Sequence, residues 1–146
     1  MWLLPFLSLW VETRQPIPFS HKTHHLLGLQ CAGCHTVPGK GTAATFPDEA
    51  KCMACHTSVK TDSPSIRLLA DYFRQKKPVP WARIYQLPDN IWFSHRRHRK
   101  SNCESCHGPV AERDVIVKEK DITMSACMDC HDETGASNEC NACHNR

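Results

Sequence analysis

The sequence predicts a mainly α-helical and coil fold with little regular structure, and three observations support this. Apolar residues make up only 40% of the 146 residues, and the mean hydropathy of −0.48 indicates a thin supply for one protein core. Helical apolar spacing is clear in only one cysteine-free stretch, residues 57–90. A strand is suggested only weakly, by "DVIVKE" around Val115.

One pentapeptide, Cys-x-x-Cys-His, occurs five times, as CAGCH, CMACH, CESCH, CMDCH and CNACH. All 10 cysteines of the chain fall inside these five copies. A disulfide framework would not require histidine after every second cysteine. Structural zinc sites combine pairs of Cys-x-x-Cys units, and five units leave one without a partner. The pattern therefore has another chemical cause.

That cause is covalent haem c. Two cysteines at this spacing form thioethers with the two vinyl groups of a haem, and the adjacent imidazole reaches the iron. The sequence thus predicts five closely packed haem c groups, around which the polypeptide wraps. The expected attachment residues are Cys31, Cys34, Cys52, Cys55, Cys103, Cys106, Cys127, Cys130, Cys140 and Cys143, and the expected proximal iron ligands are His35, His56, His107, His131 and His144.

The formal net charge of +3 does not indicate nucleic-acid binding. Each haem adds two propionates, so five haems would add a charge of about −10, which ferric iron partly offsets. Haem c is attached on the outer side of the bacterial inner membrane, so we expect a periplasmic location or one on the outer face of that membrane, with an extracellular location as the alternative.

An internal duplication organises the chain. "FSHKTH" (residues 19–24) precedes two haem motifs, and "FSHRRH" (residues 93–98) precedes the next two. We expect a first unit at 16–60, a spacer at 61–90, a second unit at 91–135 and an added fifth haem site at 136–146. In the spacer, Asp62 or Ser63 is placed to cap a short helix, which "KKPVPW" ends.

Residues 1–15 begin with the apolar stretch "MWLLPFLSLWV", which is shorter than the roughly 20 residues that span a bilayer. It has neither the positive start nor the cleavage site of a secretory signal. The segment is interpreted either as the remnant of a membrane anchor or as a strap that packs on a haem or a partner.

Five further histidines are candidates for the sixth iron position, and they cluster just before haem motifs. His21 and His24, like His95 and His98, are three residues apart and could serve two neighbouring irons. For the fifth iron, Met124, His25 and an open position are the alternatives, and Met124 is preferred because thioether sulfur also ligates haem iron.

The Phe-Ser-His-x-x-His stretches followed by Cys-x-x-Cys-His resemble class III multihaem cytochromes c. The ordered series from "PIPFSHKTHHLLGLQCAGCHT" through "PVPWARIYQLPDNIWFSHRRH" to "ITMSACMDCH" resembles the pentahaem cytochrome subunit of alternative complex III, a bacterial quinol:acceptor oxidoreductase. This resemblance covers residues 16–131. It implies a helix-and-loop haem domain whose close haems form a wire, and a membrane anchor before the first motif.

The expected function is therefore transfer of single electrons along a haem wire, without catalysis by this chain. The expected partners are redox proteins: quinol-oxidising or iron–sulfur membrane subunits on one side, and a soluble cytochrome or oxidase on the other. A homopolymeric extracellular filament and a free periplasmic shuttle are the alternatives. A small reductase acting at one five-coordinate haem is a third class, for which the sequence offers no extra catalytic residues.

Replacing Cys31 and Cys34 together by alanine should remove one covalent haem, because both thioethers of that site are lost. Intact-mass measurement should show one haem fewer than the wild type, and the fold should be less stable. Retention of five haems in the variant would refute the assignment of this site.

Overall fold

The computed structural model describes residues 14–38 and 43–144, and regular structure in these ranges is helical throughout, which confirms the expected fold class. The apolar segment 1–15 lies outside them except for Arg14 and Gln15. The helices are α1 (His21–Leu26), α2 (Cys31–Cys34), α3 (Glu49–His56), α4 (Pro64–Gln75), α5 (His95–His98), α6 (Glu104–His107), α7 (Met124–Thr134) and α8 (Cys140–His144), with a 3-10 turn, η1 (Val110–Glu112).

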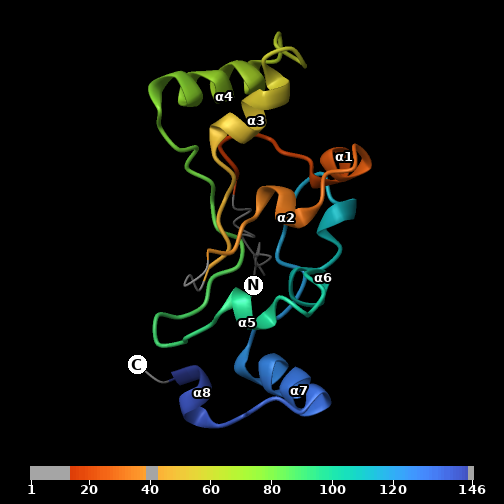
Figure 1. Cartoon of the computed structure of the whole chain (residues 1–146), viewed down its shortest axis with the longest axis vertical. Coiled ribbons are helices and arrows are strands. Elements are labelled where there is room, and N and C mark those ends of the chain that lie inside the picture. The colour runs from red at the N-terminus through yellow and green to blue at the C-terminus, as the bar shows by residue number, and fades with distance from the viewer. Residues whose placement is uncertain (1–13, 39–42, 145–146) are drawn as a thin grey trace, which may run out of the picture.

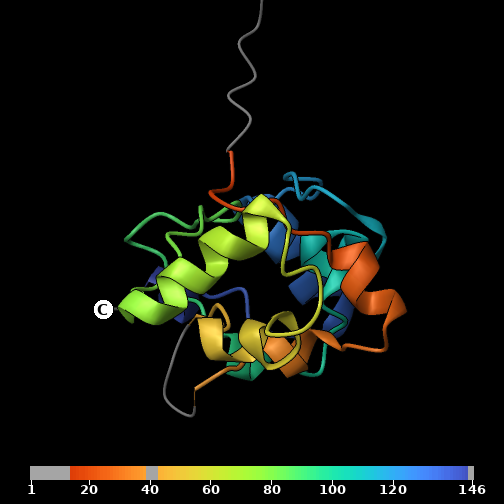
Figure 2. The ribbon, with the colours of Figure 1, turned by 90° about the horizontal axis from the view of Figure 1, so that it is seen from above.

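The helices are distributed along the long axis of the molecule, although not in their order along the chain (Figure 1). Helices α3 and α4 lie at one end, α1, α2, α5 and α6 in the middle, and α7 and α8 at the other end. Viewed along this axis, the elements lie around it (Figure 2). Within the described ranges, each helix is too short or too polar to cross a lipid bilayer.

A small apolar core holds α3 against α4. Met53 of α3 and Leu69 of α4 pack with Ile17 and Val79 from the extended segments, and all four side chains are 4–8% exposed. The backbone N–H of Val79 donates to Oε1 of Glu49 at 2.7 Å, which ties the spacer to the start of α3. The protein core is as thin as the composition predicts.

Helix α4 is the helix expected in the spacer. It starts with Pro64 in its first turn after Ser63, a position where proline loses no helical hydrogen bond. It ends at Gln75 because Lys76 adopts a left-handed conformation, with φ of 53°, before the Pro-rich stretch. The sequence suggested a strand only weakly around Val115, and this segment does not form one.

Helix α1 of the first unit contacts η1 of the second. The N–H of Lys22 donates to the carbonyl of Arg113 at 3.0 Å, and Oγ of Ser20 donates to Oδ1 of Asp114 at 2.6 Å. Ser20 also caps α1 by accepting from the N–H of Thr23 at 3.0 Å. The same residue therefore starts α1 and fixes it to a segment far along the chain.

Replacing Leu69 by alanine should lower the free energy of unfolding of the holoprotein by about 2–4 kcal/mol, because the side chain leaves a cavity in a core with few members. Leu68, its neighbour on α4, is 40% exposed and supplies the control: Leu68→Ala should cost about 0.5 kcal/mol. Chemical denaturation followed by circular dichroism measures both values. Equal losses would show that the cluster around Leu69 does not stabilise α4.

Candidate functional site

The five Cys-x-x-Cys-His pentapeptides lie on short helices. The first, third and fifth copies coincide with α2, α6 and α8 to within one residue, the second copy forms the end of α3, and the fourth copy lies within α7. Cysteines three residues apart on a helical turn point to the same side, so each pair presents both thiols together. All ten cysteines are free thiols, and none is fully buried. The arrangement suits thioether formation with a flat cofactor beside each helix.

Four of the five histidines that end the Cys-x-x-Cys-His motifs face one of the upstream histidines. The ring centroids are 6.1–6.3 Å apart in the pairs His21–His35, His24–His56, His95–His107 and His98–His131. A metal–nitrogen bond is about 2 Å and an imidazole centroid lies about 1.1 Å from its nitrogen, so two rings on opposite sides of one iron have centroids about 6.3 Å apart. The four pairs therefore fit four six-coordinate irons.

Backbone carbonyls orient five of these eight rings. The Nδ1–H of His24 donates to Ser20 at 2.7 Å, and that of His98 donates to Ser94 at 2.9 Å. The other three bonds run from His35 to Thr45 (2.9 Å), from His56 to Val59 (3.0 Å) and from His131 to Ser137 (2.7 Å). Because a carbonyl only accepts, these bonds place the proton on Nδ1 and leave Nε2 with the lone pair that binds iron.

The two Phe-Ser-His stretches have the same local geometry. Phe19 stacks on His24 with centroids 4.3 Å apart and meets His21 edge-on at 4.7 Å. Phe93 stacks on His98 at 4.4 Å and meets the ring of His95 edge-on at 4.8 Å. The phenylalanine thus fixes the directions of both histidines, which explains why it belongs to the repeated motif.

His21 is held in the neutral form that a ligand needs. Burial, followed by the nearby His35 and His24, lowers the pKa of His21 to about 4. The pKa of His107 is also lowered, again mainly by burial and then by His95 and His35. Both imidazoles are therefore uncharged at neutral pH and can offer a lone pair without first losing a proton.

The fifth motif has no such histidine partner. All 10 histidines lie in the described part of the chain, and eight of them form the four pairs. The other two are His25 and His144, which lie on α1 and α8 and are well separated along the long axis (Figure 1). His25 lines a surface hollow with Lys22, Leu26 and Glu104. The structure therefore does not bring His25 and His144 together. The other candidate for the fifth iron, Met124, is 68% exposed at the start of α7.

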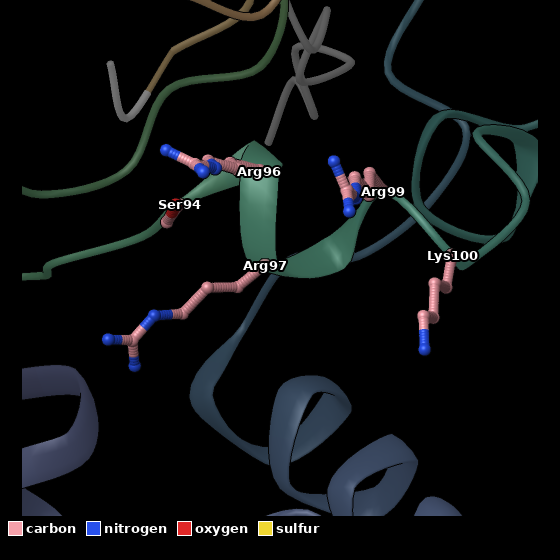
Figure 3. A pocket seen from close by; sticks show the side chains of 5 residues that line it. All are labelled: Ser94, Arg96, Arg97, Arg99 and Lys100. Carbon is pink, nitrogen blue, oxygen red and sulfur yellow. The ribbon is translucent and has the colours of Figure 1, made fainter. Parts of the chain in front are cut away.

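A basic cluster, formed by Arg96, Arg97, Arg99 and Lys100, surrounds α5 (Figure 3). Its side chains spread in different directions, and the guanidinium of Arg97 lies 4.8 Å from the ring centroid of Trp92. The N–H of Trp92 donates to the carbonyl of Cys143 at 2.7 Å. Trp92 thus connects Arg97 of the cluster to the fifth motif.

Two supporting elements had no recognisable signal in the sequence. Tyr85 lies edge-on to His107 with centroids 4.8 Å apart, and its hydroxyl donates to the carbonyl of that histidine at 3.3 Å. The same oxygen accepts from the N–H groups of Glu119 and Lys120 at 3.0 and 3.2 Å. The carbonyl acceptors for the Nδ1 groups were equally unpredictable, because every residue type carries a carbonyl.

This combination of short helices, paired thiols and paired imidazoles defines a multihaem c-type cytochrome. The sequence model of the Class III cytochrome C family matches residues 7–79, and that of cytochrome c7 and related cytochrome c matches residues 91–145. The chain belongs to the class III cytochromes c, as the motifs indicated. Members of this class hold covalent haem c and carry electrons.

One relative is the multihaem cytochrome c subunit of a menaquinone reductase from Nitratidesulfovibrio vulgaris. It is 32% identical to this chain over an alignment of 174 positions, gaps included. The alignment covers 98% of the chain and 82% of the relative. Its name assigns that relative to a menaquinone reductase. The likeness extends over almost the whole chain.

Proposed function

We propose that this chain carries five haem c groups and relays single electrons through them as a subunit of a quinone-linked oxidoreductase. The observation that carries the proposal is the set of four imidazole pairs at 6.1–6.3 Å. Bound haem would supply reversible one-electron chemistry at iron. A site with two protein ligands on its iron leaves no vacancy for a substrate, which favours transfer over catalysis.

The proposed axial sets follow the ring pairs. His35, His56, His107 and His131 are the proximal ligands of the first four irons, and His21, His24, His95 and His98 are their respective partners. Five of these eight rings are oriented through Nδ1 by backbone carbonyls, and Phe19 and Phe93 fix the directions of the upstream histidines. The protein's task is to hold these rings and to exclude other ligands.

The partners are inferred from the chemistry of the relative. Its name describes the reduction of menaquinone, whereas the sequence alone suggested oxidation of a quinol. Either direction requires two electrons per quinone, so a one-electron relay must act twice for each molecule. We place the chain on the periplasmic side of the membrane, between a quinone-reactive membrane partner and a second redox protein.

Replacing His24 by alanine should leave one iron with a single protein ligand, so that it becomes high-spin. The oxidised holoprotein should then show a high-spin signal in electron paramagnetic resonance, and its reduced form should bind carbon monoxide. His25→Ala is the matched control, because His25 adjoins His24 on the same helix but faces no proximal histidine. A His24 variant with a wild-type spectrum would contradict the pairing, and a high-spin His25 variant would make that residue a ligand.

Met124 is proposed as the sixth ligand of the fifth iron. It lies three residues before Cys127 and thus on the same face of α7. The pKa of Cys127 is raised first by burial and then by Cys106 of the third motif and Cys143 of the fifth motif, so the fifth motif is one of two that influence this face.

Met124→Ala should therefore create one high-spin or lower-potential haem, since thioether ligation raises the potential. A redox titration monitored in the visible spectrum measures this change. Met128→Ala, on the same helix, should leave the titration unchanged. An unaltered titration of the Met124 variant would instead favour His25 or an open position.

A further inference from the structure

Numbered along the chain, the haem attachment sites are site 1 (Cys31–His35), site 2 (Cys52–His56), site 3 (Cys103–His107), site 4 (Cys127–His131) and site 5 (Cys140–His144). We propose that these sites form a single line in the order 2–1–3–4–5, so that sites 2 and 5 are its ends and site 1 is internal. This order rests on the proposed function and adds where electrons reach and leave the chain.

Within each unit, the two haem sites are neighbours because a single helix carries a histidine for each of them. Helix α1 carries both His21, which faces site 1, and His24, which faces site 2. The thiols of the two sites are also close, since the pKa of Cys52 is raised first by burial and next by Cys34. Sites 1 and 2 are therefore adjacent.

Sites 3 and 4 are adjacent for the same reason. Helix α5 carries His95, which faces site 3, and His98, which faces site 4. Burial and then Cys130 raise the pKa of the Cys106 thiol, which places the two attachment sites side by side. Each unit thus contributes one pair of adjacent haem sites.

The junction between the units is made by sites 1 and 3. Site 1 on α2 and site 3 on α6 both lie in the middle of the molecule (Figure 1), and the pKa of the Cys31 thiol is raised first by burial and then by Cys103. The bonds from Lys22 to Arg113 and from Ser20 to Asp114 hold α1 and the second unit in this position. Site 2 lies on the other side of site 1, on α3 beside α4, at the end of the molecule (Figure 1).

Site 5 continues the line beyond site 4. Helices α7 and α8 together occupy the end of the molecule opposite to α3 (Figure 1), and the pKa of the Cys127 thiol is raised first by burial, then by Cys106 of site 3 and by Cys143 of site 5. A thioether sulfur is bonded at the edge of its haem, so neighbouring sulfurs on two sites bring two haem edges together. Haem held at these sites would let a single electron pass from one site to the next, with one haem oxidised as its neighbour is reduced. An external one-electron donor at one end and an acceptor at the other balance the sequence.

Proton–proton contacts in the fully reduced, diamagnetic holoprotein test the order directly. Nuclear Overhauser effects should connect the thioether protons of the site 1 haem with those of the site 3 haem, and none should connect the haems of sites 2 and 3. Contacts between sites 2 and 3 without contacts between sites 1 and 3 would overturn the order and would mean that the line follows the chain.

Removal of single haems provides a second test, with the individual potentials followed by the haem methyl resonances. Loss of site 2 through Cys52→Ala and Cys55→Ala should shift the potential of the site 1 haem alone, because an end has one neighbour. Loss of site 1 through Cys31→Ala and Cys34→Ala should shift the haems of sites 2 and 3. If loss of site 2 shifts sites 1 and 3 together, the order is wrong.

The order and the proposed function can fail separately. Haem count by intact mass and the low-spin signals of the wild type report on the cofactors and their ligands, whatever their sequence in space. If the haem count and the low-spin signals are as proposed but the Overhauser contacts differ from those expected, only the order of the sites is refuted. If a double cysteine variant does not fold, the contacts in the wild-type protein still decide between the two orders.

Discussion

The fold depends on one constraint: four histidines of the Cys-x-x-Cys-His motifs each face a histidine from a separate segment. The ring separations of 6.1–6.3 Å, which match two metal–nitrogen bonds to one iron, occur four times in the described part of the chain. Each such pair is a tertiary contact outside the small apolar core. Metal ligation can thus organise a chain whose protein core consists, among the described residues, of four buried apolar side chains.

This constraint explains why the helices are short. A helix needs only to present two thiols on one side, or two histidines three residues apart, and one or two turns suffice for either purpose. Helices α4 and α7 are longer, with 12 and 11 residues, and α4 carries none of the cysteines or histidines: its buried Leu69 packs on α3. Local caps such as Ser20, Asp48 and Thr123 start the motif helices, because helices this short gain little from their own cooperativity.

The sequence was sufficient to predict the helical character, the spacer helix and the chemistry of the motifs, because these depend on spacing along the chain. It also named His21, His24, His95 and His98 as partners, and the structure places each opposite a proximal histidine. It set His25 apart as an alternative to Met124 for the fifth iron, and the structure places His25 far from His144. Tyr85 was missed because it contacts His107 from 22 residues away along the chain. The carbonyls of Thr45, Val59 and Ser137 were missed because every residue type carries a carbonyl.

The contact of α1 with η1 has a consequence for how the chain can be divided. The backbone bond from Lys22 to Arg113 and the side-chain bond from Ser20 to Asp114 join the first quarter of the chain to its last third. A protease that cut the spacer would therefore produce a nicked molecule whose two fragments stay associated, rather than two independent halves. Any ancestor that consisted of one such unit alone would have had to cover this face of its helix in another way.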